Sequence, residues 1–196
     1  MRKIRLHPSL LLAAVFPCLG LLTWGQTALL WASATLHETG HVVAYRICKT
    51  RMKQITVLPF GICAVPENPL QTSPKNEVFC AAAGPIINLL VSVVLLALPF
   101  SADNETVLYL LYCNSALFCV NMLPILPLDG GRMVYFALAA KYDGGFCETV
   151  CRRMGWICLI LLLYPVIAAL WIDYNPSLAI IWGYLAGYTC LRRGSI

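Results

Sequence analysis

Three ionisable residues stand inside one apolar stretch of the sequence, and this feature limits the fold more than any other. The stretch runs from about residue 27 to residue 47 and holds His37, Glu38 and His41 near its middle. Side chains four residues apart lie on one face of a helix. The two histidines can therefore present imidazole nitrogens to one metal ion, with Glu38 beside them to move protons. Two core histidines and a buried acid are the alternative, but such groups in apolar surroundings are costly unless a cation compensates them.

The composition is that of an integral membrane protein. Hydrophobic residues make up 60% of the 196 residues and charged residues only 12%, whereas a soluble domain carries about 25% charge. Each transmembrane helix needs about 20 residues, so the length suits about six helices in a single domain over residues 1–196. The basic residues form no continuous stripe, which argues against a nucleic-acid partner.

The apolar runs predict an all-α polytopic membrane protein with about six transmembrane helices. We read the first run as a retained span, because signal cleavage after Ala34 would leave His37 at a new amino terminus. The predicted spans cover about residues 7–24, 26–47, 78–100, 106–126, 154–172 and 176–191.

Charge gives the orientation of these spans. All 14 lysines and arginines fall in segments on one side of the predicted topology, whereas the turns on the other side carry Asp103, Glu105 and Asp173. Basic residues concentrate in cytoplasmic loops. We therefore expect a multi-pass protein of the lipid bilayer with both termini in the cytoplasm.

A short segment after the second span predicts β-structure. Residues 53–65 are rich in β-branched side chains, and Pro59 and Gly61 indicate a bend. This pattern predicts a short β-hairpin on the cytoplasmic side. The hairpin is either a simple connection or an exposed strand edge that binds an extended peptide.

The metal motif needs a further ligand from elsewhere in the chain. The spacing of His37 and His41 around Glu38 is typical of a zinc peptidase, and a catalytic zinc usually has three protein ligands and an open position. Asp129 is the favoured third ligand, because it follows a span in a segment rich in proline and glycine. An acid at membrane depth usually serves a function. Alternatively, Asp129 caps a short helix over residues 130–140.

These motifs together resemble the site-2 protease (M50) family of intramembrane zinc metalloproteases. The resemblance covers about residues 7–193. Within the family, the sequence is similar in particular to the branch of stage IV sporulation protein FB. It is carried by the motif at residues 37–41, the segment 121–131, the loop 58–61 and the triplet 83–85. The chain departs from the common pattern at Met122, where many members have proline, and at Gly61-Ile62, where two glycines are common.

The resemblance implies one zinc ion bound by His37, His41 and Asp129, with Glu38 as the catalytic acid and base. It also implies that the substrate is bound by four residues: Asn121, Pro59, Phe60 and Gly61. The sporulation branch carries a nucleotide-sensing domain after its last span, whereas this sequence ends at Ile196. Regulation through that domain is therefore not carried over.

The function expected from the sequence is regulated proteolysis in a bacterial cell membrane, with a role in sporulation left open. The enzyme would be a metalloendopeptidase that cuts a membrane-associated protein substrate, such as a membrane-tethered pro-sigma or anti-sigma factor. Regulatory membrane proteins or a second copy of the chain are further expected partners. A membrane metal transporter and an inactive relative that binds helices are the alternatives. A transporter would show several acids along a path, and an inactive relative would have no reason to keep Glu38.

Overall fold

The structure is a computed structural model that describes residues 3–6, 22–50, 52–58, 61–66, 73–99, 104–172 and 177–191. The chain divides into two compact units, Met1–Val120 and Asn121–Ile196. The predicted single domain over residues 1–196 stays a prediction.

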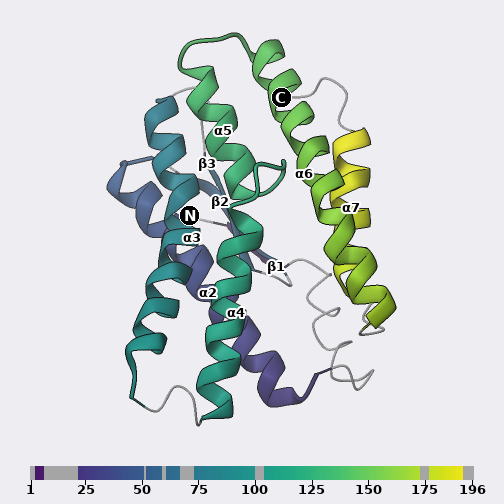
Figure 1. The fold of residues 1–196 in the computed structure, drawn as a ribbon. Helices are drawn as coiled ribbons and strands as arrows, with labels where there is room; N and C mark the ends of the chain where they lie inside the picture. Colours follow the sequence, from purple (N-terminus) through teal and green to yellow (C-terminus); the bar gives the residue numbers. More distant parts are fainter. Residues whose placement is uncertain are drawn as a thin grey trace. The chain divides into compact units, whose positions relative to one another are not determined.

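The first unit is built on the helices α2 (Trp24–Ile47), α3 (Pro74–Ala97) and α4 (Glu105–Asn121). Figure 1 shows α2 and α3 side by side, and their backbones meet at Gly40. A Cβ at Gly40 would lie 2.7 Å from the carbonyl oxygen of Ala83. The absence of a side chain at Gly40 therefore lets α2 and α3 pack closely at the position of the histidine motif.

Local sequence signals define where α2 and α3 begin. Thr23 and Gln26 form a capping box, in which the Gln26 N–H donates to Thr23 Oγ1 at 3.1 Å and the Thr23 N–H donates to Gln26 Oε1 at 2.9 Å. Ser73 caps α3 by accepting from the Asn76 N–H at 3.3 Å, and Pro74 occupies the first turn. These caps satisfy N–H groups that a helix start leaves without partners.

The first unit also contains a three-stranded sheet of β1 (Lys3–Leu6), β2 (Met52–Leu58) and β3 (Gly61–Pro66). The strand order is β1-β2-β3. β2 pairs with β3 antiparallel and with β1 parallel. β3 is consequently an edge strand of this sheet (Figure 1).

The second unit contains a turn followed by α5 (Asp129–Ala139), α6 (Gly144–Ile172) and α7 (Ser177–Leu191). Its core is a cluster of Ile125, Leu159 and Leu185, all almost fully buried. The indole N–H of Trp182 donates to the carbonyl of Leu159 at 2.8 Å and links α7 to α6.

The predicted fold class, all-α with about six transmembrane helices and a short hairpin, is wrong. The segment expected to be a hairpin supplies only two strands of a three-stranded sheet. The pairing of Lys3 with Gln54 joins distant parts of the chain, so the local sequence pattern could not reveal it.

The predicted number of about six membrane-crossing helices is also wrong for the described residues. Among the described residues, only α3 and α6 are both long and apolar enough to cross a membrane. α4 has 17 residues and α7 has 15, fewer than the roughly 20 that a span needs. Ionisable residues interrupt the apolar stretch of α2. The first predicted span lies mostly outside the described residues.

The exposed faces of the two apolar helices carry large hydrophobic side chains. On α6, Ile160, Leu161 and Trp171 are exposed, and on α3 so are Leu90 and Val94. Large exposed apolar surfaces of this kind indicate contact with a membrane or a partner.

Candidate metal centre

His37 and His41 lie one turn apart on the buried face of α2. Their side chains are 4% and 6% exposed, and their Nε2 atoms are 3.2 Å apart. Two nitrogens bound tetrahedrally to one zinc ion at 2.0–2.1 Å would be about 3.3 Å apart. The two Nε2 atoms therefore already have the spacing that one metal ion requires.

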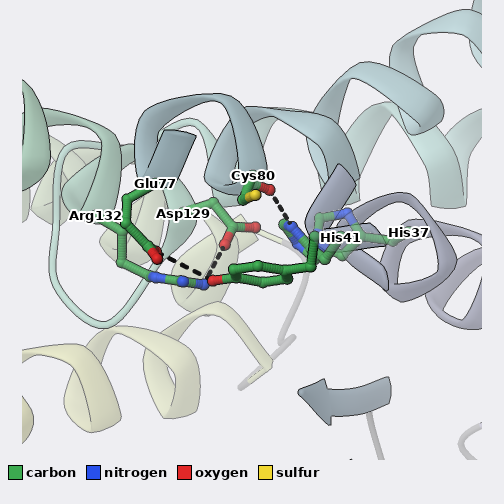
Figure 2. A network of polar contacts seen from close by, with 7 residues as sticks. His37, His41, Glu77, Cys80, Asp129 and Arg132 are labelled. Carbon is green, nitrogen blue, oxygen red and sulfur yellow. Dashed lines mark hydrogen bonds and ion pairs between the residues drawn. The ribbon is translucent and has the colours of Figure 1, made fainter. Parts of the chain in front are cut away.

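Both rings are held by their other nitrogen. His41 Nδ1 lies 2.7 Å from the carbonyl oxygen of Cys80, as the dashed line in Figure 2 shows, and His37 Nδ1 lies 2.5 Å from Asn88 Oδ1. A backbone carbonyl can only accept a hydrogen bond. His41 Nδ1 therefore carries a proton, and in the neutral ring Nε2 is the unprotonated nitrogen, which could bind a metal ion.

Gly84 on α3 keeps the space beside the two Nε2 atoms unfilled by protein. A Cβ added at this position would collide with His41 Nε2 and would lie 2.8 Å from His37 Nε2. Any larger residue would occupy the place next to both ligand nitrogens. The glycine thus leaves a cradle into which a metal ion fits, in agreement with the spacing of the histidines.

Glu38 follows His37 on α2 and is half-buried. Its carboxylate is the proton-transfer group expected beside a metal held by the two histidines. The structure places it on the same helix turn as these ligands.

Asp129 is the first residue of α5 in the second unit and is 7% exposed. Leu128 occupies the capping position, and it makes no side-chain cap hydrogen bond. The predicted short helix is present as α5. Asp129 is its first residue and not its cap, so the interpretation of Asp129 as the cap is wrong. Arg132 Nη1 forms an ion pair with Asp129 Oδ1 at 3.5 Å, one turn further along α5 (Figure 2).

Gly130 and Gly131 in the first turn of α5 allow the preceding backbone turn to pack closely against the helix. A Cβ at Gly130 would collide with the carbonyl oxygen of Met122 and would lie 2.6 Å from that of Leu123. A Cβ at Gly131 would lie 2.6 Å from the carbonyl oxygen of Ile125. The glycines after Asp129 therefore let the turn fold back tightly against the start of the helix.

The four residues predicted to bind the substrate lie in different segments of the chain. Asn121 is half-buried at the end of α4, and Gly61 begins β3. Pro59 and Phe60 lie outside the described residues. Among the described side chains, His37 and His41 in the first unit and Asp129 in the second are each buried and each offer a ligand atom for a metal ion.

The sequence reasoning did not identify the residues that hold the histidine rings. Asn88 and Asn114 are buried inside apolar helices, at 0% and 1% exposure. Both are polar residues within apolar runs of the sequence. This pattern could have indicated a buried hydrogen-bond network, because buried amides need hydrogen-bond partners. Gly84 belongs to the triplet 83–85 of the family resemblance, which assigns it no role.

Comparisons with known proteins agree with this site. The model of Peptidase family M50 matches residues 26–104, which include the histidine motif. Stage IV sporulation protein FB from Bacillus subtilis is 30% identical over 182 residues, which cover 87% of this chain and 62% of that protein. A zinc metalloprotease from Methanocaldococcus jannaschii is 29% identical over 147 residues, which cover 71% of this chain and 42% of that protein. The chain thus spans less than two thirds of the length of these relatives.

A solved structure has the same fold. The site-2 protease from Methanocaldococcus jannaschii matches with a TM-score of 0.70 and 22% identity, and the match covers 98% of this chain and 92% of that one. Among the described residues, α3 and α6 are the helices long and apolar enough to cross a membrane. The family whose model this chain matches, over residues 26–104, is peptidase family M50.

Proposed function

We propose that this protein is an intramembrane zinc metalloprotease that hydrolyses peptide bonds in or near the membrane segment of a protein substrate. The observation that carries the proposal is the pair of buried Nε2 atoms, 3.2 Å apart, facing a position that Gly84 leaves without a side chain. The family match and the relatives named as zinc metalloproteases support it.

The proposed zinc ligands are His37, His41 and Asp129. Each offers one buried ligand atom. Two imidazoles and one carboxylate are a donor set found in catalytic zinc sites, which keep a further position open. A bound cation would also offset the cost of burying the Asp129 charge.

Glu38 is the proposed general base and acid. A bound zinc ion supplies Lewis-acid polarisation of the reacting groups. Glu38 accepts the proton of the attacking water and then delivers a proton to the nitrogen of the departing amine. The peptide C–N bond breaks as the new C–O bond forms, so the products are a carboxylic acid and an amine.

The proposed substrate is a membrane-associated protein, such as a membrane-tethered pro-sigma or anti-sigma factor. β3 is an edge strand of the sheet, and an edge strand can bind an extended peptide by strand addition. We propose that Gly61 at the start of β3, the adjoining Pro59 and Phe60, and Asn121 take part in holding the substrate.

Replacement of the proposed base tests the function. Glu38→Gln should slow cleavage by about 10²- to 10⁴-fold, the usual contribution of a general acid or base, while zinc stays bound. The full chain and the variant are expressed in cells, new amino termini of membrane proteins are quantified by mass spectrometry, and zinc is measured in the purified protein. Glu105→Gln, an exposed acid in the first turn of α4, is the matched control and should cleave as the wild type does.

Equal cleavage by Glu38→Gln and the wild type would overturn the proposed mechanism. Movement of metal across the membrane without any cleavage would favour the transporter alternative. The same experiment identifies the substrate, because its fragments disappear in the Glu38→Gln cells.

A further inference from the structure

A chain of buried side-chain hydrogen bonds runs from His37 through α3 and α4 and back to α2. His37 Nδ1 lies 2.5 Å from Asn88 Oδ1, and Asn88 Nδ2 donates to Asn114 Oδ1 at 2.8 Å. Asn114 Nδ2 in turn donates to Ser33 Oγ at 3.0 Å. Ser33 lies one turn before His37 on α2, so the chain closes on the helix from which it starts.

Backbone carbonyls set the direction of this chain. Asn114 Nδ2 also donates to the carbonyl of Leu110 at 2.9 Å, and a carbonyl can only accept. The amide oxygen of Asn114 must therefore face Asn88. Asn88 Nδ2 likewise lies 3.4 Å from the carbonyl of Ser33, which again requires the nitrogen on this side.

The orientation of the two amides determines which nitrogen of the His37 imidazole carries the proton. With its nitrogen committed to Asn114 and Ser33, Asn88 presents its amide oxygen to His37, and an amide oxygen can only accept. His37 Nδ1 must then carry the proton, which makes Nε2 the unprotonated nitrogen beside Gly84. The carbonyls of Leu110 and Ser33 thus determine which nitrogen of His37 can bind a metal ion.

Burial makes this arrangement costly to reverse. Asn88, Asn114 and Ser33 are each at most 1% exposed. A buried donor or acceptor left without a partner costs about 1–3 kcal/mol. Rotation of either amide by half a turn would place nitrogen against nitrogen or oxygen against carbonyl.

We propose that Asn88 and Asn114 are positioning residues that hold His37 in the Nδ1–H tautomer and so present Nε2 to the metal ion. This inference rests on the proposed metal site. Neither asparagine binds the metal. Asn88 acts through His37, and Asn114 acts through Asn88.

The test measures zinc affinity and the His37 tautomer in the full chain in detergent. Asn88→Ala should weaken zinc binding by about 10- to 100-fold, as does the loss of other groups that orient metal ligands. Asn88→Asp keeps an oxygen acceptor for the Nδ1 proton and should recover much of the affinity. Zinc affinity is measured by competition with a chelator of known strength.

Ser92→Ala is the matched control. Ser115 Oγ donates to Ser92 Oγ at 3.2 Å and joins the same pair of helices, α3 and α4, without contact to His37. This variant loses a helix-to-helix hydrogen bond of the same kind, and it should bind zinc as the wild type does. An equal loss of affinity in Ser92→Ala and Asn88→Ala would overturn the positioning role.

The tautomer is measured from the ¹⁵N signals of labelled histidine in the metal-free protein, in which the His37 signals are those that disappear in His37→Gln. The wild type should show His37 protonated at Nδ1, and Asn88→Ala should show a mixture of tautomers. A wild type protonated at Nε2 would overturn the proposal even if Asn88→Ala failed to fold. Absence of zinc binding in the wild type would instead contradict the proposed function, and the tautomer measurement would still decide the role of Asn88.

Discussion

The surroundings of the histidines and the turn that leads to Asp129 hold their proposed metal ligands in different ways. In the first unit, each imidazole is oriented by a hydrogen bond from Nδ1, to Asn88 Oδ1 or to the Cys80 carbonyl. In the second unit, the position of Asp129 follows from the backbone, because the turn folds back tightly against Gly130. The first arrangement depends on polar partners and the second on the absence of a Cβ.

This difference has a physical reason. An imidazole can bind a metal through either nitrogen and must be fixed in one tautomer, which only a hydrogen-bond partner can do. A carboxylate has two equivalent oxygens and needs no choice of tautomer. The backbone turn brings Asp129 to its position, and Arg132 pairs with one of its oxygens at 3.5 Å. Substitutions of these two kinds of residue should therefore change different properties of the protein.

The largest effect on zinc affinity is expected at Gly84, because its missing side chain leaves the space beside the two Nε2 atoms unfilled. Gly84→Ala places a methyl group against both Nε2 atoms, and zinc affinity should fall by about 100-fold or more, the upper end for residues that orient ligands. Chelator competition measures the affinity, and thermal unfolding without metal shows whether the fold is kept. Zinc binding as tight as in the wild type would contradict the assignment of this space to the metal.

Gly130→Ala tests whether the tight backbone turn around Asp129 needs a residue without a side chain. The added Cβ collides with the carbonyl of Met122, and the free energy of unfolding should fall by about 3 kcal/mol, the upper end for overpacking. Unfolding is followed by circular dichroism without metal. Gly183→Ala in α7 is the control, because no atom of the described residues lies within 4 Å of its added Cβ, and alanine should stabilise that helix by up to about 1 kcal/mol. Equal changes in both variants would show that the turn tolerates a side chain.

The smallest effect is expected at the far end of the hydrogen-bond chain. Ser33→Ala removes one acceptor of Asn114 Nδ2 but leaves its bond to the Leu110 carbonyl. It also removes the bond that Ser33 Oγ donates to the carbonyl of Leu29 at 3.0 Å. The free energy of unfolding should fall by about 1–2 kcal/mol, at about 1 kcal/mol for each hydrogen bond, and zinc affinity should change less than in Asn88→Ala. Thr39→Ala on the exposed face of α2 is the control, because it loses only a bond to its own helix. A larger loss of zinc affinity in Ser33→Ala than in Asn88→Ala would contradict the order of the chain.

The sequence by itself determined the local part of the site. The spacing of His37 and His41 places both side chains on one face of any helix, and the caps at Thr23 and Ser73 are readable from neighbouring residues. The unusual segment around Asp129 was recognisable for the same reason. Its glycines mark a tight turn wherever that turn lies in the fold.

Only the tertiary structure decided which residues surround these motifs. Asn88 lies 51 positions after His37, and Asn114 lies 81 positions after Ser33. No local periodicity connects such residues, because their contacts depend on how α2, α3 and α4 cross. The pairing of β1 with β2 and the limited number of long apolar helices were missed for the same reason, since hydropathy describes single segments and not their partners. The histidine motif supplies the chemistry of the site, and the crossing helices determine which nitrogen of His37 can take part in it.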